Sequence, residues 1–139
     1  MTANKLTAEL KIPALAEMIS IVRLTLSSFA STMKFSNEAI EDMKIAVSEA
    51  FTNVVQYAYT KKSSGDLIKI NFTQKKEGLE VIIKDSGCGF NTKKPPQRDL
   101  HDEDIHMGLG IVFMNNLMDK VEIKSIKNKG TTVKLFKKL

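Results

Sequence analysis

The chain has 139 residues, a size that predicts one domain spanning residues 1–139 with a single core. Apolar residues make up 42% of it, which argues against disorder, and one cysteine excludes an internal disulfide framework. The net charge of +5 invites a nucleic-acid interpretation, but the chain has no Trp and only two Tyr to stack on bases. Direct nucleic-acid binding is therefore not expected.

No apolar run reaches the length of a membrane span, and the N-terminal residues show no signal-peptide pattern. We expect a protein of the cytoplasm that does not contact a membrane.

The first half of the chain predicts one strand and two helices. Apolar residues alternate over residues 6–12, which predicts an edge strand, and Pro13 is expected to begin the first helix. Apolar residues at three- and four-residue steps extend this helix to about Met33. Ser36 is the predicted N-cap of a second helix that runs to about Tyr59.

The second half predicts two hairpins that flank a charged loop and a helix. Residues 67–72 pair with 79–85, and residues 121–126 pair with 131–136. Between the hairpins, the charged and proline-containing residues 91–107 are expected to form a mobile lid, followed by a helix over 108–118.

This order predicts an α+β fold. We expect a two-layer sandwich in which helices cover a mixed, mostly antiparallel sheet.

Glu49 and Asn53 are polar residues in the otherwise apolar stretch 45–58. Their four-residue spacing places them on one helix face, one turn apart. Burying a carboxylate and an amide is costly unless a polar ligand lies beside them, and a metal ion with phosphates is such a ligand. The alternative is a solvated helix face, because Asp42 and Gln56 lie nearby on the helical wheel.

Asp85 ends a predicted strand in phase with the inward-facing apolar residues, and Gly87 and Gly89 follow it. A buried carboxylate needs a hydrogen-bond donor, and an adenine amine is one candidate. The glycines would let the backbone approach a ligand, although a tight turn after Asp85 explains them equally well.

Gly108 and Gly110 are expected at the N-terminus of the third helix, where free backbone N–H groups bind anions. A hinge for the lid is the alternative explanation. Because the GxxxxGK[ST] phosphate loop is absent, a nucleotide would have to be held by a different scheme.

The order of these motifs resembles a known family over nearly the full chain. It is similar to the Bergerat-type, histidine-kinase-like ATPase fold shared by gyrase, a class of heat-shock chaperones, histidine kinases and MutL. The motifs are Glu49-x-x-x-Asn53, Asp85-x-Gly87-x-Gly89, Gly108-x-Gly110 and Gly130-Thr131-Thr132. Residues 23–29, 40–50 and 117–121 look like bacterial anti-sigma factors of the RsbW and SpoIIAB type, which are serine-protein kinases.

The resemblance implies roles at the phosphate end of an ATP site. Asn53 would bind Mg²⁺ through its side-chain oxygen. Glu49 would be the catalytic general base for the attacking serine hydroxyl. Gly108 and Gly110 would meet the phosphates as the lid closes.

It also implies roles at the adenine end. Asp85 would accept a hydrogen bond from the adenine amine, and Thr131 would contact the base directly or through water. Gly87 and Gly89 would shape the adenine pocket.

The implied partners are a sigma factor and an anti-anti-sigma protein of the STAS type, with Arg23 as a partner contact. A homodimer is expected from the resemblance, through the first helix and the N-terminal strand.

The first hypothesis is therefore an ATP-dependent serine-protein kinase that is also an anti-sigma factor, in stress response or sporulation. The alternatives are an ATP-responsive sequestering module with weak or no kinase activity, and a switch kinase of the same fold. Tyr57 motivates the sequestering module, because this fold usually has His, Lys or Arg at that position. A fragment of a histidine kinase is disfavoured, because no helix carries a phospho-accepting His.

Overall fold

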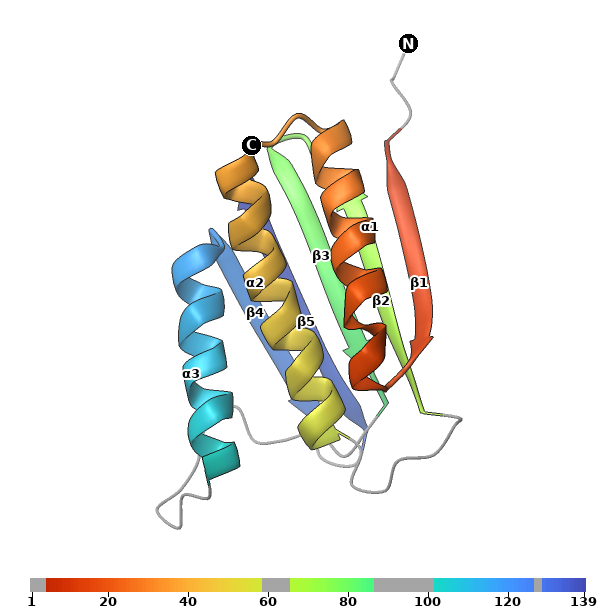
Figure 1. Cartoon of the computed structure of the whole chain (residues 1–139), viewed down its shortest axis with the longest axis vertical. Helices are drawn as coiled ribbons and strands as arrows, with labels where there is room; N and C mark the ends of the chain where they lie inside the picture. Colours follow the sequence, from red (N-terminus) through yellow and green to blue (C-terminus); the bar gives the residue numbers. More distant parts are fainter. Residues whose placement is uncertain (1–4, 59–65, 87–101, 127–128) are drawn as a thin grey trace.

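The computed structural model describes residues 5–58, 66–86, 102–126 and 129–139. Five strands form one sheet in the order β1-β2-β3-β5-β4, and all four neighbouring pairs are antiparallel (Figure 1). The strands are β1 (Thr7–Pro13), β2 (Leu67–Gln74), β3 (Gly78–Asp85), β4 (Lys120–Ile126) and β5 (Gly130–Lys138). Both predicted hairpins are confirmed, and β1 is an edge strand as its alternation predicts.

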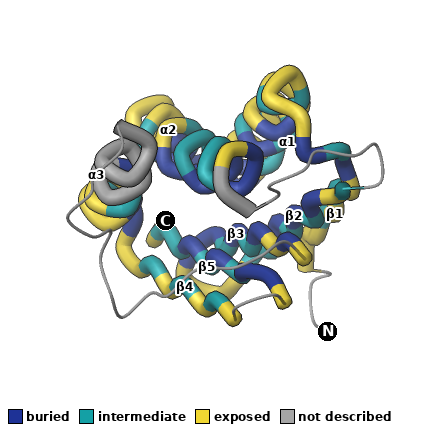
Figure 2. The backbone as a smooth tube through the Cα atoms, turned by 90° about the horizontal axis from the view of Figure 1, so that it is seen from below, coloured by how far each residue is buried: buried dark blue, intermediate teal, exposed yellow. Residues whose placement is uncertain are grey.

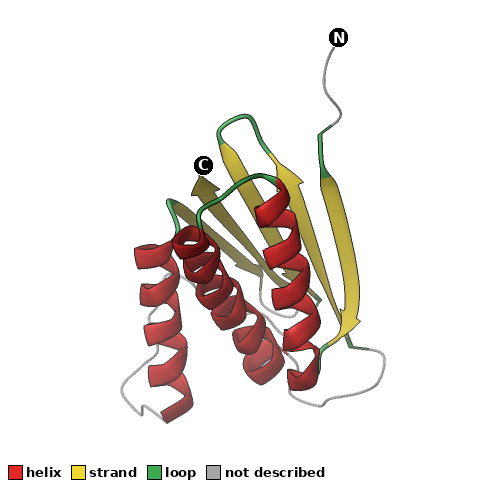
Figure 3. Cartoon of the chain, turned by 45° about the horizontal axis from the view of Figure 1, so that its top comes forward, coloured by secondary structure: helices red, strands yellow, loops and turns green. Residues whose placement is uncertain are grey.

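Three helices cover one face of this sheet, which confirms the predicted two-layer α+β architecture (Figure 2). They are α1 (Ile19–Thr32), α2 (Asn37–Asn53) and α3 (Asp102–Leu117). The helix α2 lies between the other two and packs on both (Figure 3). Among the described residues, no helix combines the length and the apolar character needed to cross a bilayer.

The core fills the space between the two layers. Strand residues with inward-facing side chains alternate with outward-facing polar ones, so β2 and β3 bury every second residue. Phe72 on β2 is fully buried, and its ring lies 6.0 Å from the ring of Phe29 on α1. Burial of this apolar face holds the helices on the sheet.

The start of α2 follows the sequence prediction. Ser36 has an extended backbone, and its Oγ accepts a hydrogen bond from the backbone N–H of Ala39 at 3.1 Å. At its other end, α2 ends at Asn53 and continues as a π-helical turn, Val54–Ala58. Short π-helical segments often occur at functional sites.

The predicted start of the first helix is wrong. Pro13 is the last residue of β1, where it pairs with Leu67, and α1 begins only at Ile19 after a 3₁₀ turn, Ala16–Met18. Proline fits both a helix start and an edge strand, because neither position requires its missing N–H.

The predicted start of the third helix is also wrong. Helix α3 begins at Asp102, so residues 102–107 of the expected lid are helical and residues 91–101 lie outside the described part of the chain. Gly108 and Gly110 consequently lie inside α3 and not at its N-terminus. Glycine lowers helix propensity, but a helix can continue through it when packing favours the helical conformation.

Candidate functional site

The polar pair on α2 lies where that helix faces α3. Glu49 and Asn53 are both half-buried, one turn apart, in the last two turns of α2. On the opposite side of the helix, Val47 and Phe51 are fully buried in the core. The pair therefore lies at the outer margin of the apolar layer.

Gly110 of α3 makes the close approach of the two helices possible. A Cβ atom built on Gly110 would lie 3.0 Å from Glu49 Oε2 and 3.4 Å from Asn53 Nδ2. Both polar side chains thus converge on Gly110, a buried position of α3 that has no side chain. Two motifs about sixty residues apart in the sequence meet here, as a shared site requires.

A second polar group lies at the end of the sheet. Asp85 is the last residue of β3, and its partner across the β3–β5 ladder is Thr131. Asp85 is 3% exposed and Thr131 is 5% exposed, and they are the two buried polar residues in the described part of the chain. Two buried polar side chains side by side at one end of an otherwise apolar layer make the sheet end a candidate site.

Gly130 forces β5 against the end of β3. Its φ is +117°, a left-handed conformation that favours glycine, and a Cβ there would overlap the backbone oxygen of Asp85. From the sequence, Gly130 was recognised only as part of a motif. Its tight packing against Asp85 depends on the β3–β5 pairing, which is not apparent from local sequence.

Ser125 is a member of this polar group that the sequence analysis missed. It lies on β4 opposite Thr131, and the two hydroxyl oxygens are 2.8 Å apart. The available signal was the alternation of β4, where Val121, Ile123 and Ser125 are the partly buried residues. A serine in that phase is polar where the pattern predicts an apolar residue.

The two groups lie at the same end of the molecule. The C-terminal end of α2 and the C-terminal end of β3 both point towards the lower edge of Figure 1, where β5 and α3 begin. The helix α2 packs directly on β3 and β5. One elongated ligand can therefore contact two side-chain pairs at once. One end would meet the helix pair, Glu49 and Asn53, and the other end would meet the sheet pair, Asp85 and Thr131.

Other predicted residues are not brought to this end or are not described. Arg23 is exposed on α1, which lies on the far side of α2 from α3 (Figure 1). Gly87 and Gly89 lie outside the described residues, as does the side chain of Tyr57. Gly108 lies two residues before Gly110 in α3.

The donor atoms fit a magnesium ion that is shared with phosphates. Within the described ranges, no cluster of three or more His, Cys, Asp or Glu side chains is placed to hold a metal. Magnesium ions that bind nucleotides usually take only one or two protein ligands. The amide oxygen of Asn53 lies near Gly110 together with a carboxylate oxygen of Glu49, and it can supply such a ligand.

Comparison with known proteins supports one family. The family model of the histidine kinase-like ATPase domain matches residues 12–137. The chain is 43% identical to serine-protein kinase RsbW of Bacillus pumilus, with 93% of this chain and 83% of that protein covered. It is 41% identical to serine-protein kinase RsbW of Bacillus subtilis, with 94% and 84% covered.

Solved structures support the fold. The RsbU and RsbW domains of Rv1364c from Mycobacterium tuberculosis match with a TM-score of 0.69 at 17% identity, over 96% of this chain and 32% of that one. A histidine kinase domain from Erythrobacter litoralis matches with a TM-score of 0.55 at 15% identity, over 92% of this chain and 62% of that one. This chain thus spans about a third of the first structure and about three fifths of the second. With the sequence relatives and the family model, these likenesses show that the chain belongs to the histidine kinase-like ATPase family, in its RsbW serine-protein kinase branch.

Proposed function

We propose that this protein is an ATP-dependent serine-protein kinase that also acts as an anti-sigma factor. It would bind a sigma factor and phosphorylate a serine of an anti-anti-sigma partner. The observation that carries the proposal is the convergence of Glu49 and Asn53 on Gly110, at the end of the molecule where Asp85 and Thr131 are buried. The relatives named serine-protein kinase support the activity.

The sheet pair suits the adenine of ATP. An ionised Asp85 carboxylate can only accept hydrogen bonds, so it matches the exocyclic amine of adenine. Thr131, its cross-strand neighbour, offers a hydroxyl beside it. In this assignment Gly87 and Gly89 shape the pocket wall, a role that rests on the resemblance alone.

The helix pair suits the phosphates. Asn53 would hold Mg²⁺ through its side-chain oxygen. A bound Mg²⁺ would neutralise part of the negative charge of the phosphates. The missing side chain at Gly110 lets α3 lie close beside Glu49 and Asn53, the pair assigned to the phosphates. Gly108, one half-turn earlier in α3, is assigned to the same end.

Glu49 is the proposed general base. Its carboxylate would accept the proton of the partner's serine hydroxyl as that oxygen attacks the terminal phosphorus of ATP. The bond between that phosphorus and the ADP oxygen breaks, so phosphoserine and ADP are the products. Asn53, one turn further along α2, would keep the phosphate within reach of Glu49.

The remaining assignments follow the resemblance. Residues 91–107 would act as an ATP lid on a single domain, residues 1–139, with residues 102–107 as the helical start of α3. Arg23, exposed on α1, would contact the sigma factor or the anti-anti-sigma protein. Both partners belong to the bacterial cytoplasm, so we assign the protein there.

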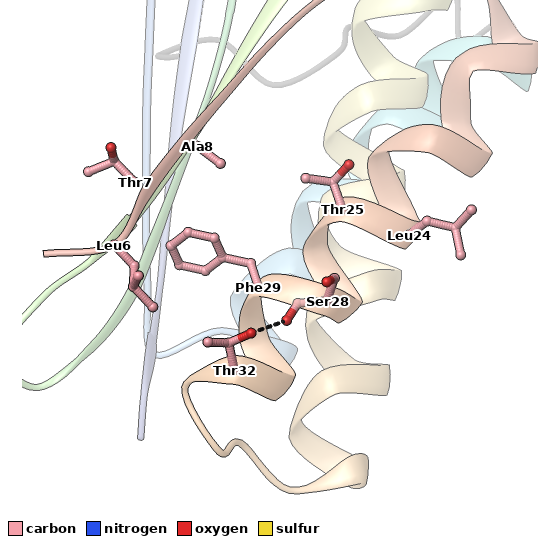
Figure 4. Close-up of a pocket in the computed structure, with 8 residues that line it drawn as sticks. All are labelled: Leu6, Thr7, Ala8, Leu24, Thr25, Ser28, Phe29 and Thr32. Carbon is pink, nitrogen blue, oxygen red and sulfur yellow. Dashed lines mark hydrogen bonds between the residues drawn. The ribbon is translucent and has the colours of Figure 1, made fainter.

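We further propose a homodimer that forms through the first strand and the first helix. A groove of about 530 Å³ lies between them, with Leu6, Leu24 and Phe29 among its lining residues (Figure 4). Leu24 is 71% exposed, and the outer edge of β1 pairs with no other described strand. The hydroxyls of Thr25 and Thr32 donate to carbonyls of α1, so they place no demand on a partner. An apolar surface at a sheet edge suits a second copy of the chain.

The substitution Glu49→Gln tests the general base. It keeps the size of the side chain beside Gly110 but removes the proton acceptor, so phosphorylation of the anti-anti-sigma protein should fall at least about a hundredfold. Affinity for Mg-ATP, measured by calorimetry, should stay near that of the wild type. Asn53→Ala should weaken both ATP binding and phosphotransfer.

Glu41→Gln is the matched control, because Glu41 lies on the same helix in an exposed pair with Lys44. It should leave both measurements unchanged. If Glu49→Gln phosphorylates the partner at the normal rate, the base assignment is wrong. If the wild-type protein binds ATP but phosphorylates no candidate partner, the sequestering module becomes the better account.

The substitution Gly110→Ala separates stability from activity. Alanine favours a helix over glycine by about 1 kcal/mol, so the free energy of unfolding of the variant should not fall. The added Cβ would meet Glu49 Oε2 at 3.0 Å and displace the carboxylate, so we expect phosphotransfer to fall about tenfold or more. Denaturant unfolding and a phosphorylation assay measure the two quantities.

The control for Gly110→Ala is Asn116→Ala, which raises helix propensity at an exposed position of α3. It should leave phosphotransfer unchanged. A Gly110→Ala protein with full activity would contradict the proposed need for a glycine beside Glu49 and Asn53.

The substitution Leu24→Asp tests the dimer. A charge in the groove should shift the protein from dimer to monomer in sedimentation velocity, because burying an unpaired carboxylate is costly. Leu139→Asp is the control, since Leu139 is a similarly exposed leucine, 69%, outside the groove. A monomeric wild-type protein, or a dimeric Leu24→Asp variant, would contradict this interface.

A further inference from the structure

Three polar side chains lie side by side at one end of the inner face of the sheet. The ladders pair Asp85 on β3 with Thr131 on β5, and Thr131 with Ser125 on β4. The same row continues on the other side of Asp85 with Ile68 and Ile12, which are buried in the core. The polar part of the row therefore ends abruptly at Asp85.

Ser125 and Thr131 are in direct contact. Their hydroxyl oxygens are 2.8 Å apart, a normal distance for a hydrogen bond between two hydroxyls. Cross-strand Ser–Thr pairs also occur with no role beyond stability. Here Thr131 is only 5% exposed and lies next to the buried carboxylate of Asp85, so the direction of its hydroxyl matters to any ligand at that carboxylate.

The hydrogen-bond chemistry gives Ser125 a specific task. A hydroxyl has one proton to donate and two lone pairs that accept. If Ser125 donates to Thr131, the proton of Thr131 stays available for a ligand. The row then presents an acceptor, Asp85, beside a donor, Thr131.

An acceptor beside a donor is complementary to the hydrogen-bonding edge of adenine and is mismatched with that of guanine. Adenine presents an amine donor next to the ring nitrogen N1, an acceptor. Guanine presents a carbonyl acceptor next to a protonated N1, which is a donor. A site that hydrogen-bonds one such edge leaves buried groups unpaired when it meets the other, so it discriminates strongly.

We propose that Ser125 is a positioning residue that holds the Thr131 hydroxyl as a donor towards the purine and thereby favours adenine over guanine nucleotides. The inference rests on the proposed function, because it requires that Asp85 and Thr131 contact the base of ATP. Ser125 acts through Thr131 and does not itself touch the nucleotide.

Ser125→Val and Ser125→Thr form a matched pair of variants. Both are β-branched residues that suit a strand, and they differ only by a methyl group in place of a hydroxyl. Calorimetry of the full chain with non-hydrolysable Mg-ATP and Mg-GTP analogues gives the affinity for each. Ser125→Val should lose about fivefold to tenfold in ATP affinity, roughly the contribution of one hydrogen bond, with little change for GTP.

Ser125→Thr keeps the hydroxyl and should therefore keep the wild-type ratio of ATP to GTP affinity. A purely structural role for Ser125 would not link this ratio to the hydroxyl. Thr132→Val controls for a hydroxyl lost from the adjacent position of β5, on the opposite face of the sheet, and should leave the ratio unchanged. Phosphotransfer at saturating ATP should be the same in all variants that bind ATP.

Three results would overturn the inference. An unchanged ATP-to-GTP affinity ratio in Ser125→Val, including equal losses for both nucleotides, would show that Ser125 does not set the preference, while the proposed function would stand. Failure of the wild-type protein to bind the ATP analogue would overturn the proposed function and this inference together. If Ser125→Val does not fold, a changed ratio in the folded Ser125→Thr protein would also contradict the proposal.

Discussion

Burial of the Asp85 carboxylate is the constraint around which the sheet end is built. Asp85 is 3% exposed, and burying a carboxylate carries a large desolvation cost. Thr131 and Ser125 extend a polar row beside it, and Gly130 lets β5 begin directly against the backbone of Asp85. The rest of the described inner face is apolar, so a polar ligand at this face of the sheet is expected only at this end.

The helix layer also places polar side chains beside the apolar core. The helix α2 buries one side against the sheet and carries Glu49 and Asn53 on another. Because α3 has a glycine where it meets them, the two helices approach closely without a clash against these polar atoms. In the proposed function the two tasks are separate, with base recognition on the sheet and phosphate chemistry on the helices. The RsbW relatives are consistent with this division, since a kinase needs both.

Periodic patterns predicted most of the fold, and the misses have physical reasons. Alternation placed Asp85 facing inwards and paired both hairpins correctly, because one buried face fixes the register. Pro13 was misplaced because proline suits an edge strand as well as a helix start. The start of α3 was missed because its first turns are charged and contain no apolar stripe. The contact of Gly110 with Glu49 and Asn53 joins segments far apart in the sequence, which no local pattern encodes. Ser125 lies in a predicted hairpin, and the alternation of β4 carried its signal.

The central claim is that the sheet pair and the helix pair serve one nucleotide. A crystal structure of the chain with a non-hydrolysable Mg-ATP analogue tests it most directly. The account predicts adenine against Asp85 and Thr131, with the metal at the side-chain oxygen of Asn53 and the terminal phosphate near Glu49. A nucleotide bound elsewhere, or one that contacts only one of the two groups, would contradict the account.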